Sequence, residues 1–199
     1  PTTVEQSAVK GWDFVDNDAD PMETTYQDWL NSGEPDYVEQ KYYTSHGTHV
    51  SGTIAGQGEN TVDYPALGVA PDVDLYGYRV LGPYGSGSSS SIIAGIDKAV
   101  QDGMDVINLS LGVQLNDPLL AESIAINNAT LAGVTCVIAA GNAGPGEKTL
   151  GSPGTAALGI TVGASDFPMG IPTASATVGS ENFDNMMLKR SVHGAATPA

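Results

Sequence analysis

Four short apolar segments, separated by longer stretches of chain, restrict the fold of this chain more than any other feature of its sequence. We predict that the apolar segments are strands; they are residues 74–81, 105–111, 134–140 and 160–163. Residues 89–102 have apolar side chains at helical spacing and are followed by Gly103, and we predict a second helix at about residues 118–132, followed by Gly133. Strands that alternate with helices pair in parallel and, when apolar throughout, are covered on both faces. The sequence therefore predicts an α/β fold with three layers, in which helices cover both faces of a mostly parallel sheet.

Functional side chains of such a fold lie in the loops that follow the carboxyl ends of the strands. Residues 110–112 and 139–142 directly follow or end two of the predicted strands. A third segment, residues 45–50, begins a short predicted helix, because Thr44 and Ser45 precede small and apolar residues at helical spacing. These three segments form the candidate site.

The composition excludes several classes of function. The 199 residues include 7 Lys and Arg against 23 Asp and Glu, which gives a net charge of −16. So few cations cannot cluster against a phosphate backbone, and we expect no nucleic-acid binding. No apolar run approaches the roughly 20 residues of a transmembrane helix, whereas a hydrophobic content of 41% suffices for a folded core. Cys136 is the single cysteine, which excludes an internal disulfide.

The two ends of the chain differ from its centre. Residues 1–43 are rich in acidic side chains and lack a regular pattern, so we expect an irregular, solvated segment. No basic stretch followed by an apolar one begins the chain, and we expect any signal peptide to be removed or to lie upstream. Residues 166–199 lose the alternation of strands and helices. We therefore assign the regular domain to residues 44–165.

Seven short motifs follow one another in residues 44–165. They are SHGTHVSGTIAG, GVAPDVDLYGYRVL, YGSGS, DVINLSLG, AAGNAGP, GSPGTA and ITVGA. In this order they resemble the central part of the catalytic domain of the subtilisin family of serine proteases, the subtilases or peptidase S8 family. With WDFVDNDADP ahead of them, they are most similar to large secreted or cell-envelope subtilases of Gram-positive bacteria. The resemblance implies a subtilisin-like endopeptidase that hydrolyses peptide bonds in proteins, is secreted or attached to the cell envelope, and needs no cofactor for its chemistry.

The resemblance also implies the roles of two residues. His46 matches the catalytic histidine, which takes the proton of the serine hydroxyl and returns it to the leaving amine. Asn142 matches the asparagine that donates a hydrogen bond to the oxyanion of the tetrahedral intermediate. By their local sequence alone, His46 also fits an ordinary helix start and Asn142 an ordinary turn. A metal site of His46 with His49, one turn later, lacks a third ligand, and we expect no metal there.

Two segments resemble those between which subtilases hold an extended peptide as an added strand. They are Gly85-Ser86-Gly87 and Ser110-Leu111-Gly112. Glycine lets the main chain of a peptide approach closely. Leu111, with Ala139, Ala140 and Gly141, is expected to line an apolar pocket for the side chain that precedes the cleaved bond. Each of these residues also fits a plain turn at the end of a strand.

Two members of the catalytic triad have no match in this sequence. No Gly-Thr-Ser motif occurs, so we expect the nucleophilic serine after residue 199. Asp16 precedes His46 by 30 residues, but no apolar strand precedes it and no Thr-Gly follows it, so we expect the triad's aspartate before residue 1. The 199-residue chain is then an inactive fragment of an active protease. In envelope-type relatives a protease-associated domain follows the strand that resembles ITVGA, and residues 166–199 match the approach to such an insertion.

Other functions remain open on the sequence alone. The same sheet suits a pseudoprotease or adhesion module that binds peptides without cutting them, and the presence or absence of triad motifs in flanking sequence distinguishes the two. Residues 82–89 have the spacing of a phosphate-binding loop, but Ser88 stands where that motif needs lysine, so a nucleotide-binding domain is a remote alternative. Glu59, Asn60 and Asp63 offer oxygen ligands for a structural calcium ion, although their loop differs from the Asn-rich calcium loop of small subtilases.

Overall fold

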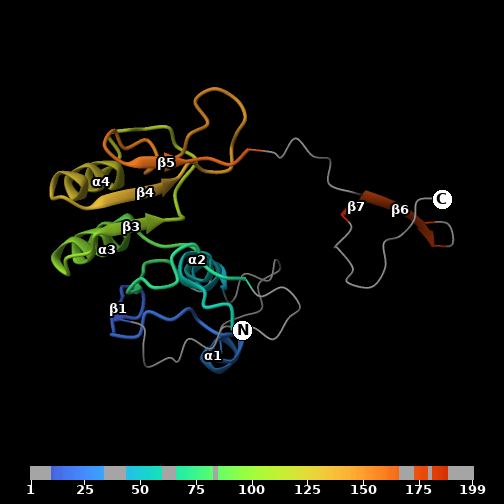
Figure 1. The fold of residues 1–199 in the computed structure, drawn as a ribbon, viewed down its shortest axis with the longest axis horizontal. Helices are drawn as coiled ribbons and strands as arrows, with labels where there is room; N and C mark the ends of the chain where they lie inside the picture. Colours follow the sequence, from blue (N-terminus) through green and yellow to red (C-terminus); the bar gives the residue numbers. More distant parts are fainter. Residues whose placement is uncertain are drawn as a thin grey trace. The chain divides into compact units, whose positions relative to one another are not determined.

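The computed structural model describes residues 10–33, 44–59, 66–82, 85–165, 173–178 and 181–187. Contacts divide the chain into two compact units, residues 1–163 and residues 164–199. The first unit holds the helices and the parallel strands (Figure 1). The second holds an antiparallel pair, β6 (Thr173–Val178) and β7 (Glu181–Met187), whose register is irregular between Ala174 and Ala176.

A three-stranded parallel sheet forms the centre of the first unit. It consists of β3 (Val106–Leu109), β4 (Thr135–Ala139) and β5 (Ile160–Val162), in that order. Helix α3 (Ser89–Gln101) leads into β3, and α4 (Ala121–Leu131) joins β3 to β4. The side chain of Ser88 caps α3 by accepting the N–H of Ser91 at 3.1 Å. Each of these elements lies within its predicted range, which confirms the α/β fold.

Apolar side chains from α3, α4 and the sheet form one core. Its buried members are Ile96, Leu109, Ala125, Ile126, Ala129, Val134, Cys136, Ile138 and Ala156. Ile126 and Ile138 are at most 1% exposed. On the described strands, by contrast, Val106, Ile160 and Val162 are each more than half exposed, at 59%, 54% and 52%. The two helices therefore cover one face of this sheet, and the predicted third layer, helices on the other face, is not seen among the described residues.

A second parallel pair consists of β1 (Lys10–Asp13) and β2 (Tyr76–Arg79). Gly11 lies opposite Gly77 with φ at +141°, and a Cβ on Gly11 would lie 1.6 Å from the carbonyl oxygen of Gly77. Only glycine permits this pairing. Helix α3 packs against the end of β2, since a Cβ on Gly95 would lie 2.8 Å from Val80 Cγ1.

The prediction of an irregular segment in residues 1–43 is wrong for two stretches. β1 lies within it, as does α1 (Tyr26–Ser32), whose Trp29 is 4% exposed. Asp13 at the end of β1 is also buried, with 1% exposed. The hydropathy pattern could not predict β1, because the segment KGWD has polar residues at both ends. The burial of Asp13 depends on its ion pair with Arg79 rather than on apolar contacts. Residues 1–9 and 34–43 lie outside the described residues.

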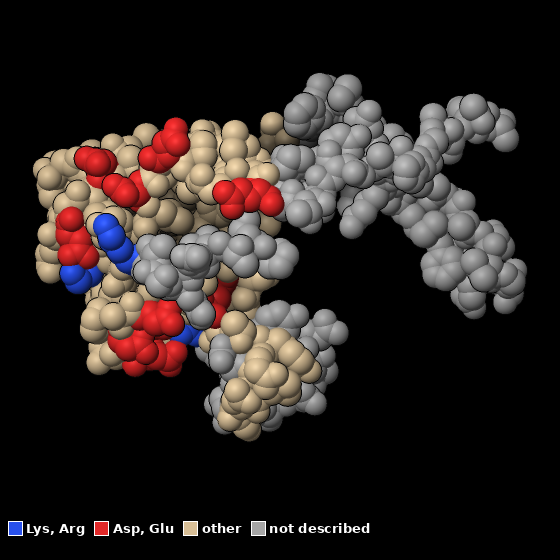
Figure 2. Space-filling view, turned by 60° about the horizontal axis from the view of Figure 1, so that its bottom comes forward, with Lys and Arg blue, Asp and Glu red and all other residues tan. Residues whose placement is uncertain are grey.

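The short helix predicted from Ser45 is α2 (His46–Ala55), which confirms that prediction. No helix within the described ranges is both long enough and apolar enough to cross a lipid bilayer. Figure 2 shows several separate groups of Asp and Glu side chains on one face and few Lys or Arg side chains, in accord with the net charge of −16.

Candidate active site

The carboxyl ends of β3 and β4 lie side by side. Leu109 is opposite Ile138 in the parallel register, so the chain leaves both strands at the same edge of the sheet. Ser110–Gly112 follow β3, while Ala139 ends β4 and is followed by Ala140–Asn142. Two of the three candidate segments are thus brought together, as predicted from the parallel fold.

Backbone hydrogen bonds tie these two segments to a third. The N–H of Val113 donates to the carbonyl of Ser152 at 2.8 Å, and the N–H of Gly151 donates to the carbonyl of Ala140 at 3.0 Å. A Cβ on Gly112 would lie 2.6 Å from the Ser152 carbonyl oxygen. Residues 151–152 are therefore hydrogen-bonded to both segments. Glycine at position 112 is needed because the backbone of Ser152 lies too close to leave room for a side chain.

Asn142 lies in an exposed turn three residues beyond the end of β4. Gly141 precedes it with φ at +92°, a left-handed conformation that glycine adopts without strain. The carboxamide of Asn142 has no hydrogen-bond partner among the described residues, which leaves its N–H groups available to a ligand. The chain carries Asn142 out of the sheet at the edge expected for a functional residue.

The segment Gly85-Ser86-Gly87 lies between the end of β2 and the start of α3. The N–H of Gly82 donates to the carbonyl of Ser86 at 2.8 Å, which folds this segment back on the end of β2. Gly85 has φ at +70°, and a Cβ on Gly87 would lie 2.1 Å from the carbonyl oxygen of Val80. Among the described residues, no hydrogen bond joins this segment to Ser110–Gly112.

His46 is the first residue of α2, and its side chain is exposed. Within the described ranges its imidazole has no hydrogen-bond or ion-pair partner. The far end of α2 is held by backbone bonds, since the N–H groups of Gly68 and Ala70 donate to Gly56 and Ile54 at 2.7 and 2.8 Å. No interaction of the described chain connects His46 directly with Asn142, so their convergence stays a prediction.

Arg79 at the end of β2 forms a polar cluster that the sequence analysis missed. Its Nη1 donates to Asp13 Oδ2 at 2.6 Å and to Asp16 Oδ2 at 2.7 Å, and its Nη2 donates to Thr24 Oγ1 at 2.6 Å. Burial lowers the pKa of Arg79, but the hydrogen bonds and charges of the two aspartates raise it by more, so the guanidinium stays charged. The sequence did offer one signal for this cluster, an arginine at the end of an apolar strand. A buried cation needs a carboxylate partner, so this arginine predicts an acidic residue close to it in the fold.

The described residues contain no group of three or more His, Cys, Asp and Glu side chains arranged to hold a metal ion. Of the residues considered for calcium, Glu59 is exposed, and Asn60 and Asp63 lie outside the described residues. A calcium ion in this loop therefore stays a prediction.

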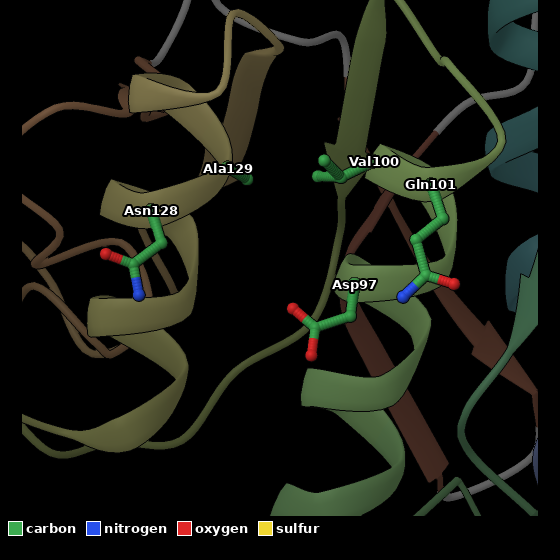
Figure 3. A pocket seen from close by; sticks show the side chains of 5 residues that line it. All are labelled: Asp97, Val100, Gln101, Asn128 and Ala129. Carbon is green, nitrogen blue, oxygen red and sulfur yellow. The ribbon is translucent and has the colours of Figure 1, made fainter.

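A shallow pocket of about 190 Å³ lies between α3 and α4 (Figure 3). Its lining is Asp97, Val100, Gln101, Asn128 and Ala129. Asp97 and Asn128 face one another across the gap from the two helices. These residues lie in the last turns of helices that lead into the starts of β3 and β4. The pocket is therefore at the end of the strands opposite the candidate site.

Comparison with known proteins supports the assignment made from the motifs. Residues 8–192 match the sequence pattern of the Subtilase family, peptidase S8. The chain is 50% identical over 160 residues to the minor extracellular protease Vpr of Bacillus subtilis (strain 168), covering 80% of this chain and 18% of Vpr. It is 45% identical over 123 residues to subtilisin DY of Bacillus licheniformis, covering 61% of this chain and 43% of that protein.

Solved structures show the same likeness. A cold-adapted subtilisin-like serine proteinase superposes with a TM-score of 0.56 at 33% identity, over 79% of this chain and 47% of that one. The chain thus spans less than half the length of each of these relatives.

Proposed function

This chain belongs to the subtilase family of serine proteases, and from that premise we propose that its site takes part in the hydrolysis of peptide bonds in proteins. The observation that carries the proposal is the hydrogen-bonded junction at the ends of β3 and β4, which presents Ser110–Gly112 beside Ala139–Asn142. A peptide held there lies against the residues that the family uses for catalysis.

His46 acts as the general base. Its imidazole takes the proton of the serine hydroxyl as that oxygen attacks the peptide carbonyl, and then gives the proton to the leaving amine. The exposed position at the start of α2 supports this role, because the side chain is open to substrate and has no hydrogen-bond or ion-pair partner among the described residues.

Asn142 stabilises the tetrahedral intermediate. Its carboxamide donates a hydrogen bond to the negatively charged oxygen that forms during attack. Its place in an exposed turn, and the lack of a partner for its N–H groups in the part of the chain that the structure describes, support this role.

The substrate binds in extended form between two segments. Gly85-Ser86-Gly87 and Ser110-Leu111-Gly112 pair with its main chain, as in the addition of a strand to a sheet edge. Leu111, Ala139, Ala140 and Gly141 line the pocket for the side chain before the cleaved bond. Leu111 and the two alanines are partly buried, which supports a pocket wall that is apolar but reachable.

The serine nucleophile and the triad's aspartate come from other parts of the full-length protein, one after residue 199 and one before residue 1. Asp16 is a poor candidate for the triad because its carboxylate binds Arg79 at 2.7 Å. Asp13 is bound to the same guanidinium. On this proposal the 199-residue chain alone is inactive. The extracellular relatives support a secreted or envelope-attached enzyme.

The test is a His46→Ala variant of the full-length protein, assayed with a casein or peptide substrate. Without its general base the enzyme should lose at least about 10³-fold in kcat/KM while its melting temperature changes little. A fluorophosphonate probe, which labels activated serines, should label the unmodified full-length protein and leave the 199-residue chain unlabelled.

Retained hydrolysis in His46→Ala would remove His46 from the mechanism. A full-length protein that binds peptides but neither cleaves them nor reacts with the probe would be a pseudoprotease or adhesion module instead.

A further inference from the structure

Helix α2 is held differently from the other long helices. It has no buried residue, whereas α3 and α4 have three and five. The side chain of Ser45, at its N-cap position, makes no capping hydrogen bond. The N-terminal N–H groups of a helix need acceptors, which other side chains or solvent supply. Hydrogen bonds at the two ends of α2 therefore contribute to the placement of His46.

Glu23 supplies one such acceptor from a distant part of the sequence. Its Oε2 accepts the backbone N–H of Thr48 at 2.7 Å, and its Oε1 accepts the hydroxyl of Thr44 at 2.6 Å. A Cβ on Gly47 would lie 3.4 Å from the carboxyl carbon of Glu23, so the carboxylate also lies against the backbone between these two residues. The contacts lie on both sides of His46, two residues before it and two after it.

The electrostatics fit a carboxylate at this place. Burial raises the pKa of Glu23, but the hydrogen bonds from Thr44, Thr48 and Gly47 lower it by more, so the pKa lies below its usual range. The start of a helix also attracts negative charge through the helix dipole. Glu23 is therefore ionised whenever the pH is near neutral.

Glu23 is itself fixed through its neighbour. The hydroxyl oxygen of Thr24 accepts a hydrogen bond from Nη2 of Arg79 at 2.6 Å, and Arg79 forms an ion pair with the buried Asp13. A continuous set of polar contacts thus runs from the ends of β1 and β2, through residues 23–24, to the first turn of α2.

We propose that Glu23 is a positioning residue, whose carboxylate holds the first turn of α2 and thereby sets the place of the His46 imidazole. The inference rests on the proposed role of His46 as general base. Glu23 touches neither substrate nor reacting atoms. Its effect is on the alignment of the base, and small misplacements of a catalytic group lower the rate strongly.

The experiment compares three variants of the full-length protein, Glu23→Ala, Glu23→Gln and Asn127→Ala. Asn127 is the matched control. Its Oδ1 also accepts a hydrogen bond from a backbone N–H far away in the sequence, that of Leu158 at 2.9 Å, but it belongs to α4 and not to the helix that begins with His46. We expect Glu23→Ala to lower kcat by about tenfold or more and to change KM by less than about twofold. Glu23→Gln keeps an acceptor oxygen and should recover part of kcat. Asn127→Ala should lower the melting temperature and leave kcat unchanged.

A second readout does not depend on catalysis. Hydrogen exchange of the Thr48 amide should be faster in Glu23→Ala than in the unmodified protein, whereas amides of α4 should be unaffected. If Glu23→Ala does not fold, Glu23→Gln serves for both readouts, with smaller expected changes.

Two results would overturn the inference: an unchanged kcat in Glu23→Ala, or equal losses of kcat in Glu23→Ala and Asn127→Ala. An unmodified protein without peptidase activity would instead refute the proposed function, and the exchange of Thr48 would still test the contact.

Discussion

Residues 85–163 and residues 10–82 are stabilised by different kinds of contact. In the first region, nine buried side chains form one core around Ile126, from two helices, the sheet and the loop before β5. In the second, Trp29 and Val80 are the buried hydrophobic side chains among the described residues. That region is held by the contacts of Arg79 with Asp13, Asp16 and Thr24, and by those of Glu23 with α2.

The two regions supply different parts of the proposed mechanism. Asn142 follows β4, which belongs to the apolar core, whereas His46 begins a helix held at its ends by hydrogen bonds. Apolar packing is indifferent to pH, but carboxylate contacts are not. The proposed oxyanion donor, Asn142, is therefore supported by contacts that do not depend on pH, whereas the proposed base, His46, is supported by contacts that do.

The largest effect is expected from Arg79→Met in the full-length protein. It leaves the buried carboxylate of Asp13 without its cation, and removal of one partner of a buried pair costs about 3–5 kcal/mol. The loss should appear in the free energies of hydrogen exchange for amides of β1 and β2, with little change in β4. A double variant, Asp13→Asn with Arg79→Met, should lose less than Arg79→Met alone. A loss equal to the sum of the two single variants would show that the pair is not coupled.

A smaller effect is expected from Ile126→Val, which removes one methyl group from the apolar core. Ile126 is fully buried, and such a deletion costs about 0.5–1.5 kcal/mol. Exchange free energies should fall for amides of α4 and β4 and stay the same at Thr48. Equal losses in both regions would mean that they unfold as one unit, which would contradict a difference in how the two regions are stabilised.

The smallest effect is expected from acid, because Glu23 is only partly buried and solvent weakens its contacts. The pKa of Glu23 is lowered in the folded protein, so its contacts stabilise the fold above the usual pKa of glutamate and are lost as the pH falls through the lowered value. Thr44, Gly47 and Thr48, which it contacts, do not titrate. The protection factor of the Thr48 amide should fall in acid while that of Ile126 stays constant; the reverse order would contradict this account.

Periodicity predicted the region held by apolar contacts well. The elements α3, β3, α4, β4 and β5 all lie within their predicted ranges, because burial of a sheet and two helices leaves a regular apolar pattern. The place of Ser110–Gly112 beside Ala139–Asn142 also followed from the parallel order of the strands.

The region held by polar contacts was not predictable in the same way. The segment KGWD carries no strand pattern. Glu23 is one of ten acidic residues in residues 1–45, and nothing in the sequence distinguishes it as the one that contacts α2. Such contacts join residues far apart in sequence, 66 positions for Asp13 and Arg79 and 25 for Glu23 and Thr48. No local rule relates them, and only the folded chain reveals them.

The most direct measurement is a crystal structure of the full-length protein with a bound peptide boronic acid, which mimics the tetrahedral intermediate. We predict that one boronate oxygen accepts a hydrogen bond from the carboxamide of Asn142, that the imidazole of His46 lies within hydrogen-bond distance of the serine oxygen bound to boron, and that the peptide pairs with residues 85–87 and 110–112. A complex in which His46 and Asn142 lie at different edges of the sheet, or in which neither contacts the inhibitor, would contradict the account.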